Sequence, residues 1–136
     1  MIARFNFEYM TGNQEFIKII QSLDIPRICD LLKSGTNPNI QTSQGDPVLL
    51  WASRYGNLDI VKLLIEHGAD IHAKNANDET ALMWAIVEGN IDIVRYLIQQ
   101  GADLNTKTKS GETVLSWASI TGNKDIFKIL KNAGAR

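Results

Sequence analysis

Short apolar segments alternate with polar, glycine-containing stretches along most of the chain. Segment 48–55 is compact and apolar and is followed by Gly56, a common helix terminator. Asn57 is a suitable N-cap for a second segment, whose apolar residues recur at helical spacing at Leu58, Val61, Leu64 and Ile65. Gly68 ends this segment, and the residues after it are typical of turns. The pattern therefore predicts two short helices, over 48–55 and 58–67, and an extended connection.

The same pattern returns every 33 residues. Residues 45–77 and 78–110 are identical at 14 of 33 positions without a gap, and a third copy starts at Gly111. A fainter copy precedes them, because the segment 31–35 lies 33 residues before the related segment 64–68. A helix pair of this size cannot bury its apolar faces alone, so the copies must stack. The sequence therefore predicts an N-terminal arm, 1–11, and an all-α solenoid, 12–136, with repeats at about 12–44, 45–77, 78–110 and 111–136.

One copy begins with Thr80-Ala81-Leu82-Met83-Trp84-Ala85, its second helix is predicted to start at Gly89-Asn90-Ile91, and its turn contains Gly101-Ala102-Asp103. On these residues the repeats resemble, over roughly residues 12 to 136, those of the ankyrin-repeat family, whose motif T-P-L-H-x-A stands at the first of these positions. The resemblance implies helix-turn-helix units joined by β-hairpin-like loops. The family's histidine is replaced by Leu50, Met83 and Ser116. Since that histidine ties loop backbone groups together, we expect the hairpins to be held less firmly.

The terminal copies carry charge where the inner copies are apolar. Lys124 and Lys131 in the last copy, and Arg27 and Asp30 in the first, replace apolar residues of the inner copies. The inner counterparts are Leu58, Ile65, Ile91 and Ile98 on one side of the second helix, and Ile60, Leu63, Ile93 and Tyr96 on the other. Terminal repeats need polar outer faces. We therefore expect the four charged side chains to face solvent at the ends of a complete four-repeat domain.

The first residues fall outside the repeat. Phe5, Phe7 and Tyr9 alternate with polar residues, which indicates a half-buried strand. The aromatic side chains either cover the end of the first repeat or form an arm that docks a partner or a second copy of the chain.

Composition and charge narrow the functional classes. The 136 residues are 44% hydrophobic and 21% charged, enough apolar content for one domain with a core. Fourteen Lys and Arg against fifteen Asp and Glu argue against a nucleic-acid binder, which would be basic. The apolar stretches are too short to span a membrane. The single cysteine, Cys29, excludes an internal disulfide framework and fits a cytoplasmic protein.

No catalytic constellation is visible. The sequence has no nucleophile elbow, P-loop, dinucleotide fingerprint or zinc-type Cys/His set. Cys29 falls on a helix face where the other copies have Lys or Arg, so we expect it to be accessible and structural. His67 and His72 flank a turn, but two imidazoles make an incomplete metal site. The sequence therefore predicts no catalytic residue, no metal and no cofactor.

The resemblance also implies where a partner binds, since ankyrin-repeat proteins use their hairpin tips and the exposed, concave side of their first helices. By position, the tip residues are Gln44, Asp46, Asn77, Glu79, Ser110 and Glu112, and the helix residues are Arg54, Tyr55, Val87, Glu88, Ile120 and Thr121. Trp51, Trp84 and Trp117 form a row one repeat apart. The indoles either fill the seams between repeats or reach the concave face as binding anchors.

Two features of the predicted partner-binding residues differ from an ordinary polar, uncharged surface. Asp46, Glu79 and Glu112 form a row of carboxylates, and Tyr55, Val87 and Ile120 are apolar where packing does not require it. The row is either a solvated rim or the acidic edge of a binding site with a hydrophobic centre. Residues 56–104 hold three basic and eight acidic side chains, whereas residues 105–136 hold six and two. This asymmetry favours a charged partner, whose association it would steer.

The hypothesis from sequence is a monomeric, non-catalytic module that binds another protein with a basic surface. Because the whole chain is used by the scaffold, it would act by occupying its partner, as an inhibitor, an adaptor or an immunity-type protein. The alternatives are an assembly protein that uses the aromatic arm and, least favoured, an enzyme with a small-molecule pocket near the tryptophans.

Overall fold

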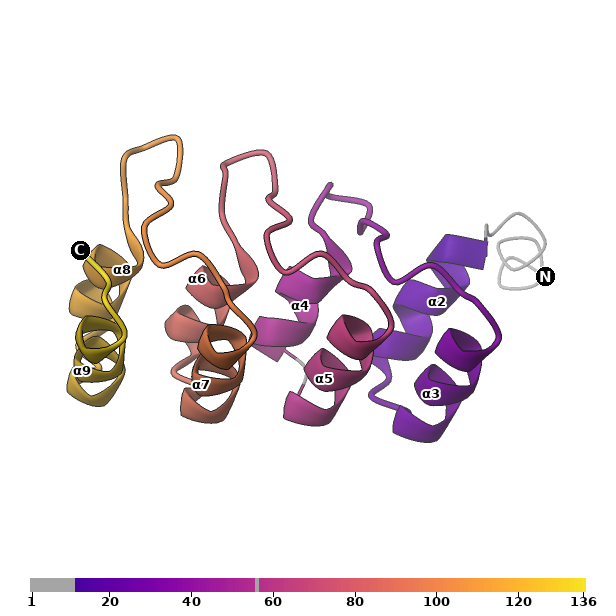
Figure 1. Cartoon of the computed structure of the whole chain (residues 1–136). Helices are drawn as coiled ribbons and strands as arrows, with labels where there is room; N and C mark the ends of the chain where they lie inside the picture. The colour runs from indigo at the N-terminus through magenta and orange to yellow at the C-terminus, as the bar shows by residue number, and fades with distance from the viewer. Residues whose placement is uncertain (1–11, 56) are drawn as a thin grey trace.

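The computed structural model describes residues 12–55 and 57–136, which form four helix pairs stacked in a row (Figure 1). The first helices of the pairs are α2 (Gly12–Gln21), α4 (Val48–Tyr55), α6 (Ala81–Glu88) and α8 (Val114–Thr121). The second helices are α3 (Ile25–Lys33), α5 (Leu58–Glu66), α7 (Ile91–Gln99) and α9 (Lys124–Asn132). The predicted all-α solenoid is thus confirmed. The N-terminal arm, for which a strand was predicted, lies outside the described residues.

Asparagine side chains start three of the second helices. Asn57, Asn90 and Asn123 each accept a hydrogen bond from the backbone N–H three residues later, at 3.0, 3.1 and 3.0 Å. These bonds satisfy helix donors that have no partner within the helix. The predicted cap at Asn57 is therefore confirmed, and α5 ends at Glu66, one residue before the predicted boundary, with His67 as its C-cap.

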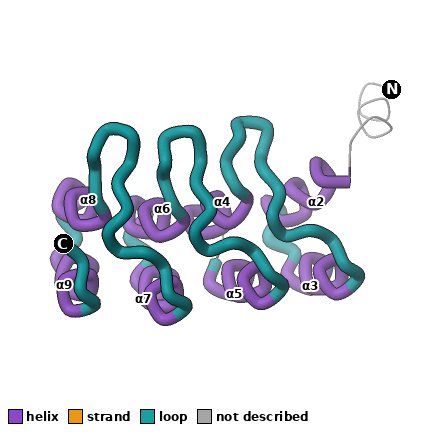
Figure 2. The backbone as a smooth tube through the Cα atoms, turned by 45° about the horizontal axis from the view of Figure 1, so that its top comes forward, coloured by secondary structure: helices purple, strands orange, loops and turns teal. Residues whose placement is uncertain are grey.

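The core runs through all four pairs without interruption. One isoleucine and one leucine of each later second helix are fully buried, and the rows are Ile60, Ile93, Ile126 and Leu64, Leu97, Leu130. Helices α4, α6 and α8 pack side by side, and α3, α5, α7 and α9 form a parallel second row. Loops of hairpin shape project from the row of first helices (Figure 2). Each repeat therefore completes its neighbour's core, as stacking predicts.

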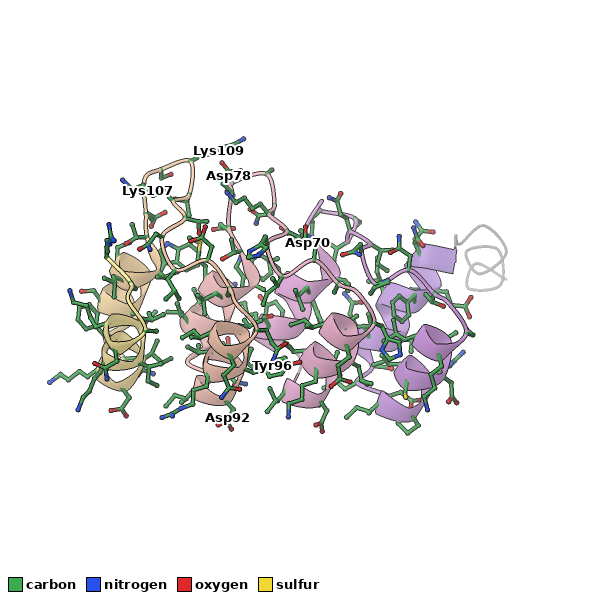
Figure 3. The ribbon with its side chains drawn as sticks, in the orientation of Figure 1. Asp70, Asp78, Asp92, Tyr96, Lys107 and Lys109 are labelled. Atoms are coloured by element: carbon green, nitrogen blue, oxygen red, sulfur yellow. The ribbon has the colours of Figure 1, made fainter. Side chains whose placement is uncertain are left out.

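Aromatic packing closes the seam between α5 and α7. Tyr96 occupies the position of Leu63 one repeat earlier, and the ammonium of Lys62 lies 5.5 Å from its ring centroid. Burial raises the pKa of the Tyr96 phenol above its ordinary value, and the nearby Glu66 carboxylate adds to the effect. The labelled ring lies among the second helices, on the side of the molecule away from the hairpins (Figure 3).

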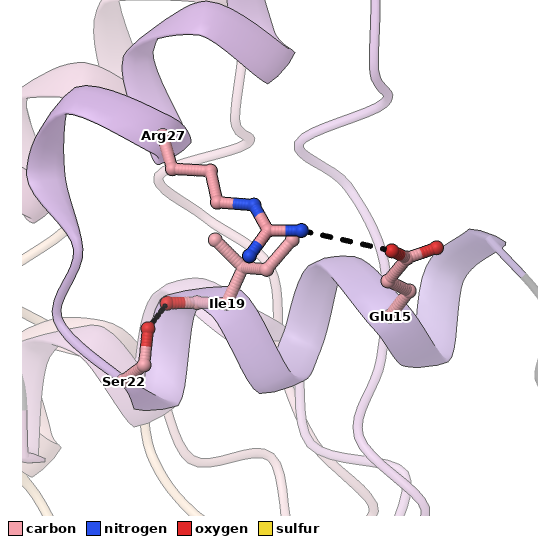
Figure 4. Close-up of polar contacts among 4 residues, drawn as sticks. All are labelled: Glu15, Ile19, Ser22 and Arg27. Carbon is pink, nitrogen blue, oxygen red and sulfur yellow. Dashed lines mark hydrogen bonds and ion pairs between the residues drawn. The ribbon is translucent and has the colours of Figure 1, made fainter. Parts of the chain in front are cut away.

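The charged replacements predicted for the two ends are all exposed. Arg27 and Asp30 lie on the outside of α3, and Lys124 and Lys131 lie on α9. The Arg27 guanidinium lies 3.9 Å from the Glu15 carboxylate of α2 (Figure 4). Close to this pair, at the end of α2, the Ser22 hydroxyl donates to the Ile19 carbonyl at 2.6 Å. Solvated charges of this kind contribute little stability. Their effect here is to keep the end surfaces polar.

One strained residue joins α2 to α3. Leu23 has a φ of 60° and is 42% exposed, whereas the equivalent residues two and three repeats later are Gly89 and Gly122, with φ of 75° and 72°. A side chain in this left-handed region costs roughly 1–2 kcal/mol.

We expect Leu23→Gly to be more stable than Leu23→Ala by about 1 kcal/mol, because alanine keeps the Cβ that the left-handed region disfavours. The alanine variant loses the same side-chain contacts, so the comparison isolates the backbone effect. Urea unfolding followed by far-UV circular dichroism measures the difference. Equal free energies of unfolding for the two variants would contradict the backbone explanation.

Candidate functional site

The residues predicted at the hairpin tips fall into two groups. Gln44, Asn77 and Ser110 are exposed, whereas Asp46, Glu79 and Glu112 are half-buried, close to the start of the first helices. The outer part of the loops carries other charges: Asp78, Lys107 and Lys109 are labelled there, away from the helices (Figure 3). The carboxylate row therefore belongs to the stems of the hairpins. Of the six residues predicted at the tips, only Gln44, Asn77 and Ser110 are exposed.

Asn75, which was not among the predicted site residues, connects two of these carboxylates. Its amide nitrogen donates to Asp46 at 3.1 Å and to Glu79 at 2.6 Å, which links adjacent hairpins. Its amide oxygen accepts from the backbone N–H groups of Asn77 and Glu79, both at 3.0 Å. The sequence feature that could have identified Asn75 is its position in the repeat, where two other copies have a hydrogen-bonding threonine, Thr42 and Thr108. Hydrogen bonds of this kind hold the hairpins without the family's histidine.

The three residues that replace the family's histidine have two different roles. Leu50 and Met83 are fully buried in the core. Ser116 instead forms a capping box with Thr113: the Thr113 N–H donates to the serine hydroxyl at 2.8 Å, and the Ser116 N–H donates to the threonine hydroxyl at 3.1 Å. The start of α8 is thus fixed by its own side chains.

The three tryptophans are half-buried and have different partners. Trp51 packs against Tyr55 with ring centroids 5.6 Å apart. The indole N–H of Trp84 donates to Glu79 at 3.3 Å, whereas that of Trp117 is buried with no hydrogen-bond partner in the described part of the chain. All three indoles pack against the core, as the seam-filling interpretation predicts, and their use as binding anchors stays a prediction.

Exposed apolar side chains lie at the ends of the first helices. Tyr55 is 49% exposed and Ile120 is 75% exposed, and both are large apolar residues without a core role. Val87 is half-buried and lines, with Ile120 and Trp117, an open cavity of about 260 Å³. Glu112 and Thr121 complete the lining of this cavity. The first helices thus present an apolar centre with a carboxylate at its edge, and we call it the first-helix surface.

Charged side chains surround this surface. Glu88 lies 3.8 Å from the Arg54 guanidinium, and both side chains are partly exposed. Asp46 and Glu79 lie in the neighbouring hairpin stems, so the first-helix surface and these stems together hold the carboxylates of Asp46, Glu79, Glu88 and Glu112 and the Arg54 guanidinium, a formal charge of −3. The last hairpin carries Lys107 and Lys109 farther out (Figure 3).

The remaining candidate groups give no reaction centre. Within the described residues, no three His, Cys, Asp or Glu side chains are arranged to hold a metal ion. The His67 ring nitrogen Nδ1 lies 2.9 Å from the Leu63 carbonyl, a local helix contact, and Cys29 is half-buried. A cavity of about 180 Å³ lies between two loops and has Lys74, His72 and Asp103 in its lining. Among the described residues in its lining, no nucleophile–base pair is formed.

None of the helices in the described ranges is long and apolar enough to cross a membrane.

The stacked helix pairs, the projecting hairpins and the open first-helix surface define a helical-repeat solenoid of the kind that presents one face to a ligand. A family model described as ankyrin repeats (3 copies) matches residues 16–108 and again residues 68–136. The chain belongs to the ankyrin-repeat family. Ankyrin repeats generally serve as protein–protein interaction modules. No curated protein matches the chain.

Proposed function

We propose that this protein is a non-catalytic binding module that recognises a basic surface of a partner protein through its first-helix surface and hairpin tips. The observation that carries the proposal is the exposure of Tyr55 and Ile120, with the Glu112 carboxylate in the same cavity lining as Ile120. Large apolar side chains are central to protein interfaces, and surrounding charges select the partner and speed its association.

As a module that only binds, the protein would act by occupying its partner, as an inhibitor, an adaptor or an immunity-type protein. A standard interface buries about 800 Å² on each partner, an area that one face of four repeats can supply. The single cysteine supports a cytoplasmic setting.

An affinity capture from lysate of the source organism tests the proposal. The test variant combines Tyr55→Ala, Glu88→Lys and Ile120→Ala, all at exposed positions. Glu79 is left unchanged because Asn75 and Trp84 donate to its carboxylate. The matched control combines Glu66→Lys, Gln99→Ala and Asn132→Ala, which changes the charge equally at exposed positions on the second helices.

We expect a protein captured by the wild type and by the control to be lost by the test variant. With that partner purified, calorimetric titration should show about a 100-fold weaker affinity for the test variant, since truncated anchor residues cost 2 kcal/mol or more. A partner that binds all three proteins equally would contradict the first-helix surface as the binding site.

A further inference from the structure

The seam between α4 and α6 contains a slot that the chain fills with its own arginine. The Arg54 side chain leaves α4 and reaches the Trp84 ring of α6, with its guanidinium carbon 6.0 Å from the ring centroid. The same carbon lies 4.9 Å from the Tyr55 ring centroid, and Nε lies 3.8 Å from the Glu88 carboxylate. A guanidinium between aromatic faces and a carboxylate is a favourable arrangement.

One repeat later, the equivalent slot is open. Val87 stands at the position of Arg54, Trp117 at that of Trp84 and Thr121 at that of Glu88. Valine is too short to cross the seam. The result is the open cavity of about 260 Å³ in whose lining all three residues lie.

The lining of the open slot also contains the Glu112 carboxylate, which has a single long side-chain hydrogen bond among the described residues. Glu112 is half-buried and forms no ion pair within residues 12–55 and 57–136. Its side chain accepts a hydrogen bond from the Thr108 hydroxyl at 3.4 Å, whereas the equivalent Glu79 accepts from Asn75 at 2.6 Å and from Trp84 at 3.3 Å. A partly buried carboxylate is stabilised by an added cationic donor. Among the described residues no Lys or Arg lies in the lining of this cavity, and its apolar walls suit the methylene groups of a long side chain.

We propose that the cavity over Trp117 receives an arginine side chain presented by the partner protein. The guanidinium lies over the Trp117 ring beside Glu112, and the methylene groups contact Val87 and Ile120. Arginine is favoured over lysine because its planar group can lie flat over an indole, and the Arg54 guanidinium carbon lies over the Trp84 ring, 6.0 Å from its centroid, one repeat earlier. The inference rests on the proposed function and specifies its partner: a protein with an exposed arginine.

The test uses a blocked tripeptide, acetyl-Gly-Arg-Gly-amide, titrated into the ¹⁵N-labelled protein. Each tryptophan gives one indole N–H cross-peak in a ¹H–¹⁵N spectrum, and single Trp→Phe variants assign them. We expect the Trp117 cross-peak to shift saturably, with a dissociation constant in the millimolar range because one side chain supplies about 4 kcal/mol or less. The cross-peaks of Trp51 and Trp84 should not shift.

Two further peptides separate charge from size and shape. Citrulline keeps the shape of arginine without its charge, so acetyl-Gly-citrulline-Gly-amide should bind at least about fivefold more weakly. If a leucine tripeptide shifts the Trp117 cross-peak at lower concentration than the arginine tripeptide, the cavity is an apolar anchor site and the proposal is wrong. An unshifted Trp117 cross-peak at saturating peptide also overturns it.

Two variants test the residues assigned to the slot. Glu112→Gln should weaken the arginine peptide about five- to tenfold, while Glu66→Gln, an exposed control on α5, should leave its affinity unchanged. Val87→Arg should fill the slot as Arg54 does and abolish the shift, while Val87→Ala should not abolish it. An unchanged affinity in both Glu112→Gln and Val87→Arg would remove the proposal.

This result is independent of the lysate experiment. A partner that binds elsewhere would contradict the proposed binding surface while the Trp117 titration still succeeds. Conversely, a partner lost by the test variant and a silent Trp117 cross-peak would keep the surface and refute only the arginine slot.

Discussion

Replacement of Asn75 by alanine is expected to lower the free energy of unfolding by about 2–3 kcal/mol. The side chain donates to two carboxylates and accepts from two backbone N–H groups at the base of one hairpin. Alanine leaves the carboxylates of Asp46 and Glu79 close together without their shared donor. Hydrogen bonds to charged groups are worth more than neutral ones, and the partial exposure of this site keeps the total modest.

Asn75→Thr is the matched control, because the repeat places threonine at the same position in two other copies. The Thr42 and Thr108 hydroxyls accept from the Asp46 and Glu112 backbone N–H groups at 3.3 and 3.1 Å. Threonine should therefore keep the turn but lose the link between hairpins, and cost about half as much as alanine. Urea unfolding of the three proteins measures both differences. An alanine variant as stable as the wild type would show that the hairpins are held by other contacts.

Ile98→Lys is expected to cost about 2 kcal/mol of unfolding free energy. Ile98 is half-buried on α7 and packs against the core, and α7 contacts α9. Lysine at this position loses apolar contact, and its ammonium must reach water past the neighbouring helix. Thermal and urea unfolding of the purified variant measure the loss.

The reverse exchange at the equivalent position of α9 is the control. Lys131 is exposed, and within the described residues α9 has a second-helix neighbour only in α7. Lys131→Ile should therefore change the free energy of unfolding by no more than about 0.5 kcal/mol. If Ile98→Lys and Lys131→Ile were equally destabilising, the two positions would have the same environment. That result would contradict the half-buried position of Ile98 and the exposed position of Lys131.

The helix pairs were largely predictable because their signals are local and repeated. Asn57 before an apolar segment predicts a helix start, and the 33-residue period predicts that the same start recurs at Asn90 and Asn123. The charged replacements Arg27 and Lys131 were predicted to be exposed from the same register, and both are.

The candidate site was only partly predictable. The exposed apolar residues Tyr55 and Ile120 were found from their helix positions. The roles of Asp46, Glu79 and Glu112 differ although the sequence makes them equivalent: Asn75 bonds the first two, and the third lines a cavity. Such differences depend on which side chain reaches across from the neighbouring hairpin, whereas the repeat register compares only equivalent positions of different repeats.

The family, the repeat length, the helix starts and the exposed charges of the first and last helix pairs were all predictable, since each follows from residue type and spacing along one chain. Which carboxylates are bonded, which indole N–H has no partner among the described residues and which slot is open depend instead on contacts between neighbouring repeats. Arg54 and Val87 are equivalent in the repeat, yet one fills a seam and the other leaves a cavity. That difference depends on whether a side chain is long enough to contact the neighbouring helix. The residues that meet across a seam are about 30 positions apart in the sequence, as Arg54 and Trp84 are.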